Sequence, residues 1–250
     1  MSRFSLFRIT SAALATCALV VAATGCEHEA PRKLPPDFLE TAKKHYSQFD
    51  EDKIIRHFFD DRERGFFLDV GCAEWNLNSA TLYLEKHLGW KGIAVDARAE
   101  LRQGWTRNRP GAKFFNYIVT DHAGTKDKFY WAGGISSTNA DHVKSFPGAE
   151  DVDLKRLERE APTITLNQLL DEQGVKKIDF MLMDIELGEP PALRGFDIER
   201  FKPELVCVEA GNEGVRGFIS KYFPEHGYER IEEYLKYDKT NWYYRPIPGR

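Results

Sequence analysis

The chain has 250 residues, of which 42% are hydrophobic and 30% are charged, so it can bury one sizeable core and is neither disordered nor fibrous. The formal net charge is -4, and basic residues are interspersed with acidic ones, which excludes the usual electrostatic pattern of a nucleic-acid-binding protein. We therefore expect one enzyme-sized domain and no nucleic-acid partner.

Residues 1–33 have the pattern of an export signal followed by a short tether. Two arginines precede an uncharged apolar stretch, residues 9–23, which runs into the motif Ala23-Thr24-Gly25-Cys26, similar to the cleavage box of bacterial lipoproteins. On this interpretation Cys26 carries a lipid, and the protein is exported and held at a membrane. Two alternatives stay open: an uncleaved signal anchor, for which the apolar stretch is marginally short, and a mis-assigned start codon, which leaves the protein in the cytoplasm.

Residues 34–64 are expected to form one or two helices that cover one end of a sheet, because apolar residues such as Phe38, Ala42 and Tyr46 recur at helical spacing. The main domain then spans residues 65–250.

Residues 66–96 form a strand-helix-strand pattern. An apolar run, residues 66–70, predicts a buried strand that ends beside Gly71, and residues 77–88 carry leucines and an alanine at helical spacing, with Gly89 as a helix end. A second apolar run, residues 92–95, predicts the next strand, which ends at Asp96.

Two parallel strands joined by a right-handed crossover place Asp69, Gly71 and Asp96 on one rim of the sheet, where open α/β folds bind ligands. Gly71 permits close approach of a ligand, and Asp96 can accept hydrogen bonds from a ribose diol. A nucleoside-containing cofactor is one interpretation; the alternative is that these acids only cap helices.

The middle of the chain predicts a helix at residues 99–108 and a strand at residues 112–119. Thr120 and Asp121 end that strand, and Asp121 is either a ligand for an adenine amino group or an ordinary turn residue. A short strand, residues 129–132, precedes the polar loop 133–142, which is either a lid that binds an acceptor or a solvated loop. The charge-alternating residues 151–160 predict an exposed helix face.

Three segments resemble the FkbM-type methyltransferases, which use S-adenosylmethionine. They are Asp69-Val70-Gly71-Cys72-Ala73-Glu74-Trp75, Leu84-Glu85-Lys86-His87-Leu88-Gly89-Trp90 and Ile93-Ala94-Val95-Asp96. The resemblance implies an α/β, Rossmann-like class I methyltransferase fold with a mostly parallel seven-stranded sheet, a C-terminal antiparallel hairpin and helices on both faces. It implies S-adenosylmethionine as the cofactor, held by Asp69, Gly71, Cys72, Glu74, Asp96, Ala97, Thr120 and Asp121.

Some positions depart from the family pattern. Trp75 stands where the family has the second glycine of its turn, Ala73 replaces an asparagine, and Asp96-Ala97 replaces an acid-Pro pair. The Trp75 indole is therefore expected to take up space that the glycine leaves for the cofactor. Residues 47–52 match the family's S-Q-x-x-E-D motif, either as part of the pocket's closure or as a solvated helix start.

The resemblance continues through a second acidic segment. Residues 178–184 predict a strand ending in Asp184, Glu186 follows, and residues 205–209 predict a strand ending in Glu209. These acids are expected to converge at the carboxyl end of the sheet and to raise one another's pKa, with Asp184 as the catalytic base and Glu186 and Glu209 orienting it or the acceptor. The alternative is that they cap helices and bind water.

Cys72 and Cys207 lie in apolar strand contexts and are expected to be buried thiols, although a disulfide is an alternative in an oxidising compartment. No spacing typical of a metal site occurs. The first functional hypothesis is an O-methyltransferase that acts on a hydroxyl of a sugar or other small metabolite. The second is an exported, membrane-tethered, non-catalytic binding domain on the same scaffold.

Overall fold

The structure is a computed structural model, and it describes residues 33–249. The predicted export signal and the lipid site at Cys26 lie outside these residues. Within the described part of the chain, no helix has the length and apolar character needed to cross a membrane.

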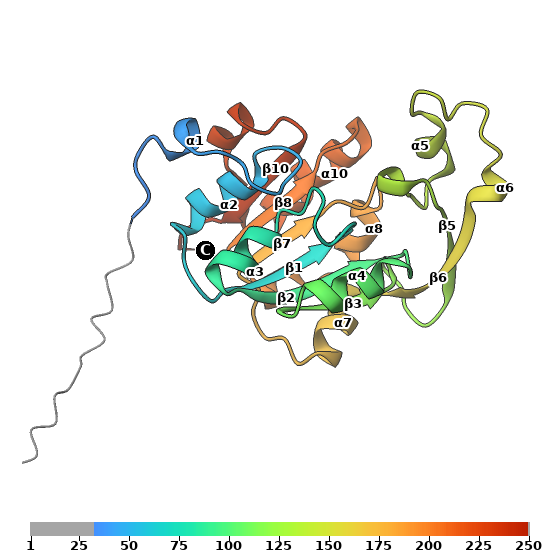
Figure 1. Cartoon of the computed structure of the whole chain (residues 1–250), viewed down its shortest axis with the longest axis horizontal. Coiled ribbons are helices and arrows are strands. Elements are labelled where there is room, and N and C mark those ends of the chain that lie inside the picture. The colour runs from blue at the N-terminus through green and yellow to red at the C-terminus, as the bar shows by residue number, and fades with distance from the viewer. Residues whose placement is uncertain (1–32, 250) are drawn as a thin grey trace, which may run out of the picture. The chain divides into compact units, whose positions relative to one another are not determined.

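A seven-stranded sheet forms the centre of the domain, in the order β3-β2-β1-β7-β8-β10-β9 (Figure 1). Five strands are parallel: β1 (Phe66–Val70), β2 (Lys91–Asp96), β3 (Ala112–Asn116), β7 (Phe180–Met183) and β8 (Leu205–Glu209). The last strand, β10 (Asn241–Pro246), runs antiparallel between β8 and β9 (Tyr228–Arg230), and η2 (Glu232–Lys236) connects β9 to β10. The topology confirms the predicted sheet with its C-terminal antiparallel hairpin.

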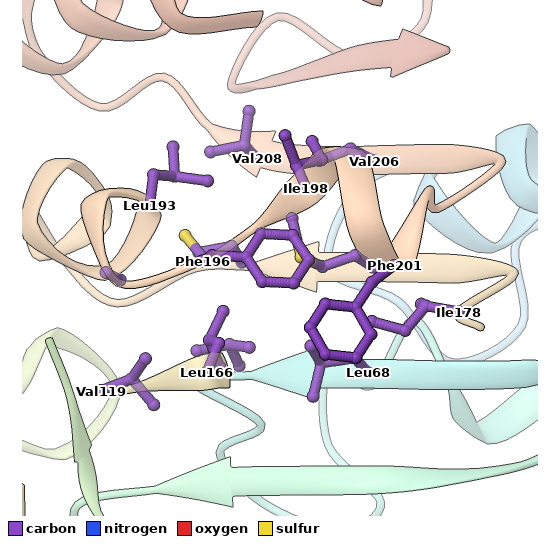
Figure 2. Packing of buried hydrophobic residues seen from close by; sticks show 14 of the residues in the cluster. Leu68, Val119, Leu166, Ile178, Leu193, Phe196, Ile198, Phe201, Val206 and Val208 are labelled. Atoms are coloured by element: carbon purple, nitrogen blue, oxygen red, sulfur yellow. The ribbon is translucent and has the colours of Figure 1, made fainter. Parts of the chain in front are cut away.

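The strands are buried on both faces, and alternate residues enter two separate apolar layers. Leu68 and Val70 of β1 pack with α7 (Leu166–Glu172), α8 (Glu189–Arg194), α9 (Ile198–Phe201) and α10 (Glu213–Glu225), a layer that Figure 2 shows around Leu193, Phe196 and Phe201. Phe67 instead packs with the opposite layer, formed by α1 (Phe38–Thr41), α2 (Glu51–Phe59), α3 (Leu82–Leu88) and α4 (Leu101–Asn108). Because each buried side chain of this kind contributes about 1.5–3 kcal/mol, both layers hold the sheet in place.

A smaller sheet has the order β4-β6-β5, with β4 (Ile118–Val119), β5 (Lys126–Tyr130) and β6 (Glu158–Ile164). It carries η1 (Gly133–Ile135), α5 (Ala140–Lys144) and α6 (Leu154–Leu157), and Figure 1 shows β5, β6, α5 and α6 together beyond the central sheet. Two predictions are wrong here. The strand expected at residues 112–119 divides between two sheets, because residues 118–119 pair with β6. The helix expected at residues 151–160 has only four residues, because the chain from Glu158 onward pairs with β5.

The crossover helix α3 begins at Leu82 with Thr81 as its N-cap, whereas the sequence places the cap at Asn78 or Ser79. Leu77 lies in a bend and is 62% exposed, and Asn78 has a left-handed φ of 56°, so neither residue is part of the helix. The helix end is confirmed, because Gly89 has a φ of 66° and its N–H donates to the Leu84 carbonyl.

Residues 47–52 are not a solvated helix start, because Ser47, Glu51 and Asp52 are all buried. Asp52 Oδ2 accepts from the backbone N–H groups of His45 and Tyr46, at 2.6 and 2.8 Å. The buried acid therefore fixes the chain that leads into α2.

Candidate active site

A cavity of about 710 Å³ opens at the carboxyl ends of β1, β2 and β7, within the size range of small-molecule sites. Seven of the residues predicted to hold the cofactor line it: Asp69, Gly71, Cys72, Glu74, Asp96, Ala97 and Thr120. Asp184 and Glu186, two of the predicted catalytic acids, line the same cavity. The structure thus brings the two predicted groups to one place.

Gly71 fixes the floor of the cavity. Its φ is 84°, and a Cβ at this position would lie 1.7 Å from the backbone oxygen of Asp184. The turn after β1 therefore packs directly on the segment after β7, and only glycine satisfies both the backbone angle and the close approach.

Asp69 presents an acceptor without a partner. Its Oδ2 accepts from Thr81 Oγ1 at 2.7 Å, whereas its buried Oδ1 has no hydrogen-bond partner among the described residues. Burial raises the pKa of Asp69 to about 6, although the Thr81 hydroxyl and the Arg109 charge act in the opposite direction. Because a buried polar atom without a partner is costly, Asp69 Oδ1 is suited to a donor supplied by a ligand.

Asp96 ends β2 as predicted, but its carboxylate already has partners within the protein. Oδ1 accepts from Arg98 N–H at 2.9 Å and from Arg98 Nε at 3.0 Å. Oδ2 accepts from Arg98 Nη2 at 3.0 Å and from Ala73 N–H at 3.1 Å. Arg98 lines the cavity, and the sequence interpretation gave it no role.

The Trp75 indole does not enter the cavity, so the expectation that it takes up cofactor space is wrong. Trp75 packs against α4, where its Cδ1 lies 2.6 Å from the position that a Cβ would occupy at Gly104. The neighbouring Ala73 has a left-handed φ of 49°, a conformation that asparagine or glycine adopts more readily than alanine. The turn keeps its shape at the cost of strain at Ala73.

Asp121 lies away from the lining of the cavity. Its Oδ2 accepts from Arg194 Nε at 3.1 Å, and its Oδ1 contacts His122. The chain turns into β4 at Ile118, and this displaces Asp121 from the end of the main sheet. The residues that line the cavity in this region are Tyr117, Ile118, Val119 and Thr120.

Asp184, which lines the cavity, forms a hydrogen-bonded pair with Glu209, which does not. Burial first, and then the Glu209 carboxylate, raise the pKa of Asp184 well above its usual value. The pKa of Glu209 rises to about 7 through burial and through Glu186 and Glu189. The proton that the pair shares therefore lies on Asp184, which donates it to Glu209.

Glu186 instead pairs with His142, which the sequence placed only in a polar loop. His142 Nε2 lies 2.6 Å from Glu186 Oε2, and Ser137 Oγ donates to the Glu186 carbonyl at 2.5 Å. Burial, with Asp184 and Glu189, raises the pKa of Glu186 to about 8, and burial lowers the pKa of His142. At pH 7 the proton between them consequently sits on Glu186, which donates to a neutral imidazole.

Gln48 and Glu51 line the cavity from the segment before the sheet. Glu51 Oε2 accepts from Phe49 N–H at 2.6 Å, and burial raises the pKa of Glu51 to about 7. Both residues belong to the S-Q-x-x-E-D motif at residues 47–52, so their place in the cavity agrees with the interpretation of that motif as part of the pocket's closure.

Residues 69–235, more than half of the chain, match the Methyltransferase FkbM domain. The chain belongs to the FkbM methyltransferase family. Its cofactor is accordingly S-adenosylmethionine. No curated protein matches the chain.

The FkbM domain is also similar to solved methyltransferase structures, at low identity. A TehB-like SAM-dependent methyltransferase from Corynebacterium glutamicum has 13% identity and a TM-score of 0.44, covering 80% of this chain and 89% of its own. The precorrin-6y C5,15-methyltransferase from Geobacter metallireducens has 9% identity and a TM-score of 0.42, with 81% and 89% covered. With scores below 0.5, these likenesses add nothing to the family assignment.

Proposed function

We propose that this FkbM methyltransferase transfers a methyl group to a hydroxyl of a sugar or another small hydroxylated metabolite. The observation that carries the proposal is a single cavity lined both by the Gly71 turn and Asp96 and by the acidic segment after β7. One side of the cavity suits a nucleoside cofactor. The other side carries Glu186, which is paired with His142.

The residues present fit the cofactor. The cavity has the necessary size, and Asp69 Oδ1 is a buried acceptor in need of a donor. We place the adenosyl group between the turn at residues 71–74 and Asp96, with Ala97 and Thr120 beside it. Bound S-adenosylmethionine supplies an electrophilic methyl group, and the protein must orient the accepting oxygen toward it and remove its proton.

The pair Glu186 and His142 is the proton acceptor in this proposal, in place of Asp184. Glu186 is paired with an imidazole that can take its proton on, whereas Asp184 is paired with a second carboxyl group, so we assign Asp184 and Glu209 the role of supporting the segment that carries Glu186. The acceptor hydroxyl gives its proton to the free carboxyl oxygen of Glu186 while the proton on Oε2 moves to His142 Nε2. His142 ends as an imidazolium, which balances the loss of the cofactor's positive charge.

The other wall of the cavity supports the proposed class of acceptor. Ser136, Ser137 and Thr138 from the loop, with Lys126 and Asp127 from β5, offer hydroxyl, ammonium and carboxylate groups. Such a mixed polar lining supports a small polyhydroxylated acceptor rather than an apolar one.

We also propose, from the sequence pattern alone, that the domain is exported and held at a membrane through the N-terminal segment or a lipid on Cys26. Fractionation of cells that express the wild type and Cys26→Ser tests this directly. Recovery of both forms in the cytoplasm would contradict it.

The second candidate function is a non-catalytic binding domain, and the complete set of donors on Asp96 favours it. Calorimetry with S-adenosylmethionine and S-adenosylhomocysteine separates the two. The enzyme should bind both saturably, and Asp96→Ala should weaken binding about tenfold or more. Absence of heat with every form would favour the binding domain.

A further inference from the structure

Arg98 fills the hydrogen-bonding capacity of Asp96. A carboxylate has about four acceptor positions, and four donors reach Asp96: the backbone N–H groups of Ala73 and Arg98, and Nε and Nη2 of the Arg98 guanidinium. No position remains for a ribose hydroxyl while the guanidinium stays in place.

The contact is buried and fixed at both ends. Arg98 is 7% exposed and Asp96 is 8% exposed, and Arg98 Nη1 also donates to the Gly133 carbonyl at 3.0 Å. Because both partners are shielded from water, the Coulomb attraction between them is screened less than in a surface ion pair. Arg98 is therefore a defined part of the cavity wall.

The two side-chain donors of Arg98 match the number and arrangement of donors in a ribose diol. The guanidinium presents two N–H groups side by side, one to each oxygen of Asp96. A cis-diol presents two adjacent O–H groups. When the guanidinium is removed, the two backbone donors stay on Asp96 and two acceptor positions become free.

We infer that Arg98 occupies the ribose position of the cofactor site and sets the affinity of the enzyme for its cofactor. This inference rests on the proposed function. When the cofactor binds, two hydrogen bonds from the Arg98 guanidinium to Asp96 are replaced by two hydrogen bonds from the ribose hydroxyls, and the Arg98 side chain turns away. Glu74 and Glu186 already interact electrostatically with Arg98 and can attract a displaced guanidinium. Since the free protein rests in the Arg98-bound state, the apparent affinity is lowered by the small fraction in which Asp96 is open.

The test is calorimetry of the full chain with S-adenosylhomocysteine, using the wild type, Arg98→Met and Arg102→Met. Arg98→Met removes the donors and keeps an apolar side chain of similar reach. Arg102 is the matched control, an exposed arginine on α4 with no contact to Asp96. We expect Arg98→Met to bind about tenfold more tightly than the wild type, and Arg102→Met to bind within about twofold of it.

A further variant keeps the test decisive if Arg98→Met does not fold. Arg98→Lys retains the charge but not the planar fork, so it should also bind more tightly than the wild type, by about threefold. Equal or weaker binding by the Arg98 variants, with normal binding by the wild type, overturns the inference and leaves the proposed function standing. No binding by the wild type or by any variant overturns both.

Discussion

His142 Nε2 lies 2.6 Å from Glu186 Oε2, which links the segment after β5 to the loop after β7. The Glu186 backbone is held in the left-handed region with a φ of 53°, and Leu187 follows with a φ of 74°. Left-handed residues other than glycine cost free energy and persist only where surrounding contacts fix them. The hydrogen bonds from Ser137 and to His142 supply such contacts, so the strained segment positions the acid at the cavity.

The buried acids should make the protein less stable as the pH rises. Burial raises the pKa of Glu186 to about 8, so above about pH 4.5 the unfolded chain releases a proton that the folded protein retains. Stability is then lost as the pH rises through the folded-state pKa. Between pH 5.5 and 8.5, urea unfolding should show that Glu186→Gln loses about 1–3 kcal/mol less stability than the wild type.

Glu225→Gln is the control for this experiment, because Glu225 is exposed near the end of α10. Its loss of stability between the two pH values should equal that of the wild type. If Glu186→Gln lost as much unfolding free energy between the two pH values as the wild type, Glu186 would be ionised in the folded protein. The proposed proton path would then be wrong.

Gly71→Ala should be much more harmful than the same change at Gly124. Both glycines have left-handed φ angles, of 84° and 82°, so each substitution carries a backbone cost of about 1 kcal/mol. Only at Gly71 would the new Cβ also meet a backbone oxygen, while Gly124 has open space around it. Thermal unfolding should show an additional loss of about 3 kcal/mol at Gly71. Equal losses at both positions would mean that the two loops do not pack as described.

Trp75→Ala should lower stability without changing cofactor affinity. The indole packs on Gly104 outside the cavity, so its loss should cost about 1–3 kcal/mol of unfolding free energy. Calorimetry with S-adenosylhomocysteine should give a Kd within about twofold of the wild type. A rise in affinity of about tenfold would place the indole in the cavity after all.

Ala73→Gly should stabilise the turn after β1. Ala73 has a φ of 49°, and glycine relieves this strain, for a net gain of about 0.5–1 kcal/mol after its greater chain entropy is counted. Ala123→Gly serves as the comparison, because Ala123 does not have a left-handed φ. This substitution relieves no strain and should only lower stability, through the greater chain entropy of glycine. Thermal unfolding that shows Ala73→Gly to be no more stable than the wild type would argue against a strained turn.

The sequence predicts the central sheet well, because strands buried on both faces read as apolar runs, and β1, β2, β7 and β8 are such runs. It also predicts which acids end those strands. The sequence does not predict the places where hydrogen bonds between particular side chains, or pairing in the smaller sheet, determine the local structure. The Thr81 hydroxyl forms hydrogen bonds with Asp69 and Arg109 directly before α3. Residues 118–119 pair with β6 in the smaller sheet, so Asp121 does not lie at the end of the main sheet. The contacts of Arg98 with Asp96 and of His142 with Glu186 depend on side-chain directions that periodicity does not encode.

A crystal structure of the full chain with S-adenosylhomocysteine tests the central claim most directly. We predict the adenosyl group between the turn at residues 71–74 and Asp96, with the ribose hydroxyls on the Asp96 carboxylate and Arg98 turned away from it. A ligand bound elsewhere, or a cavity without ligand at saturating concentration and with Arg98 still on Asp96, would contradict the account.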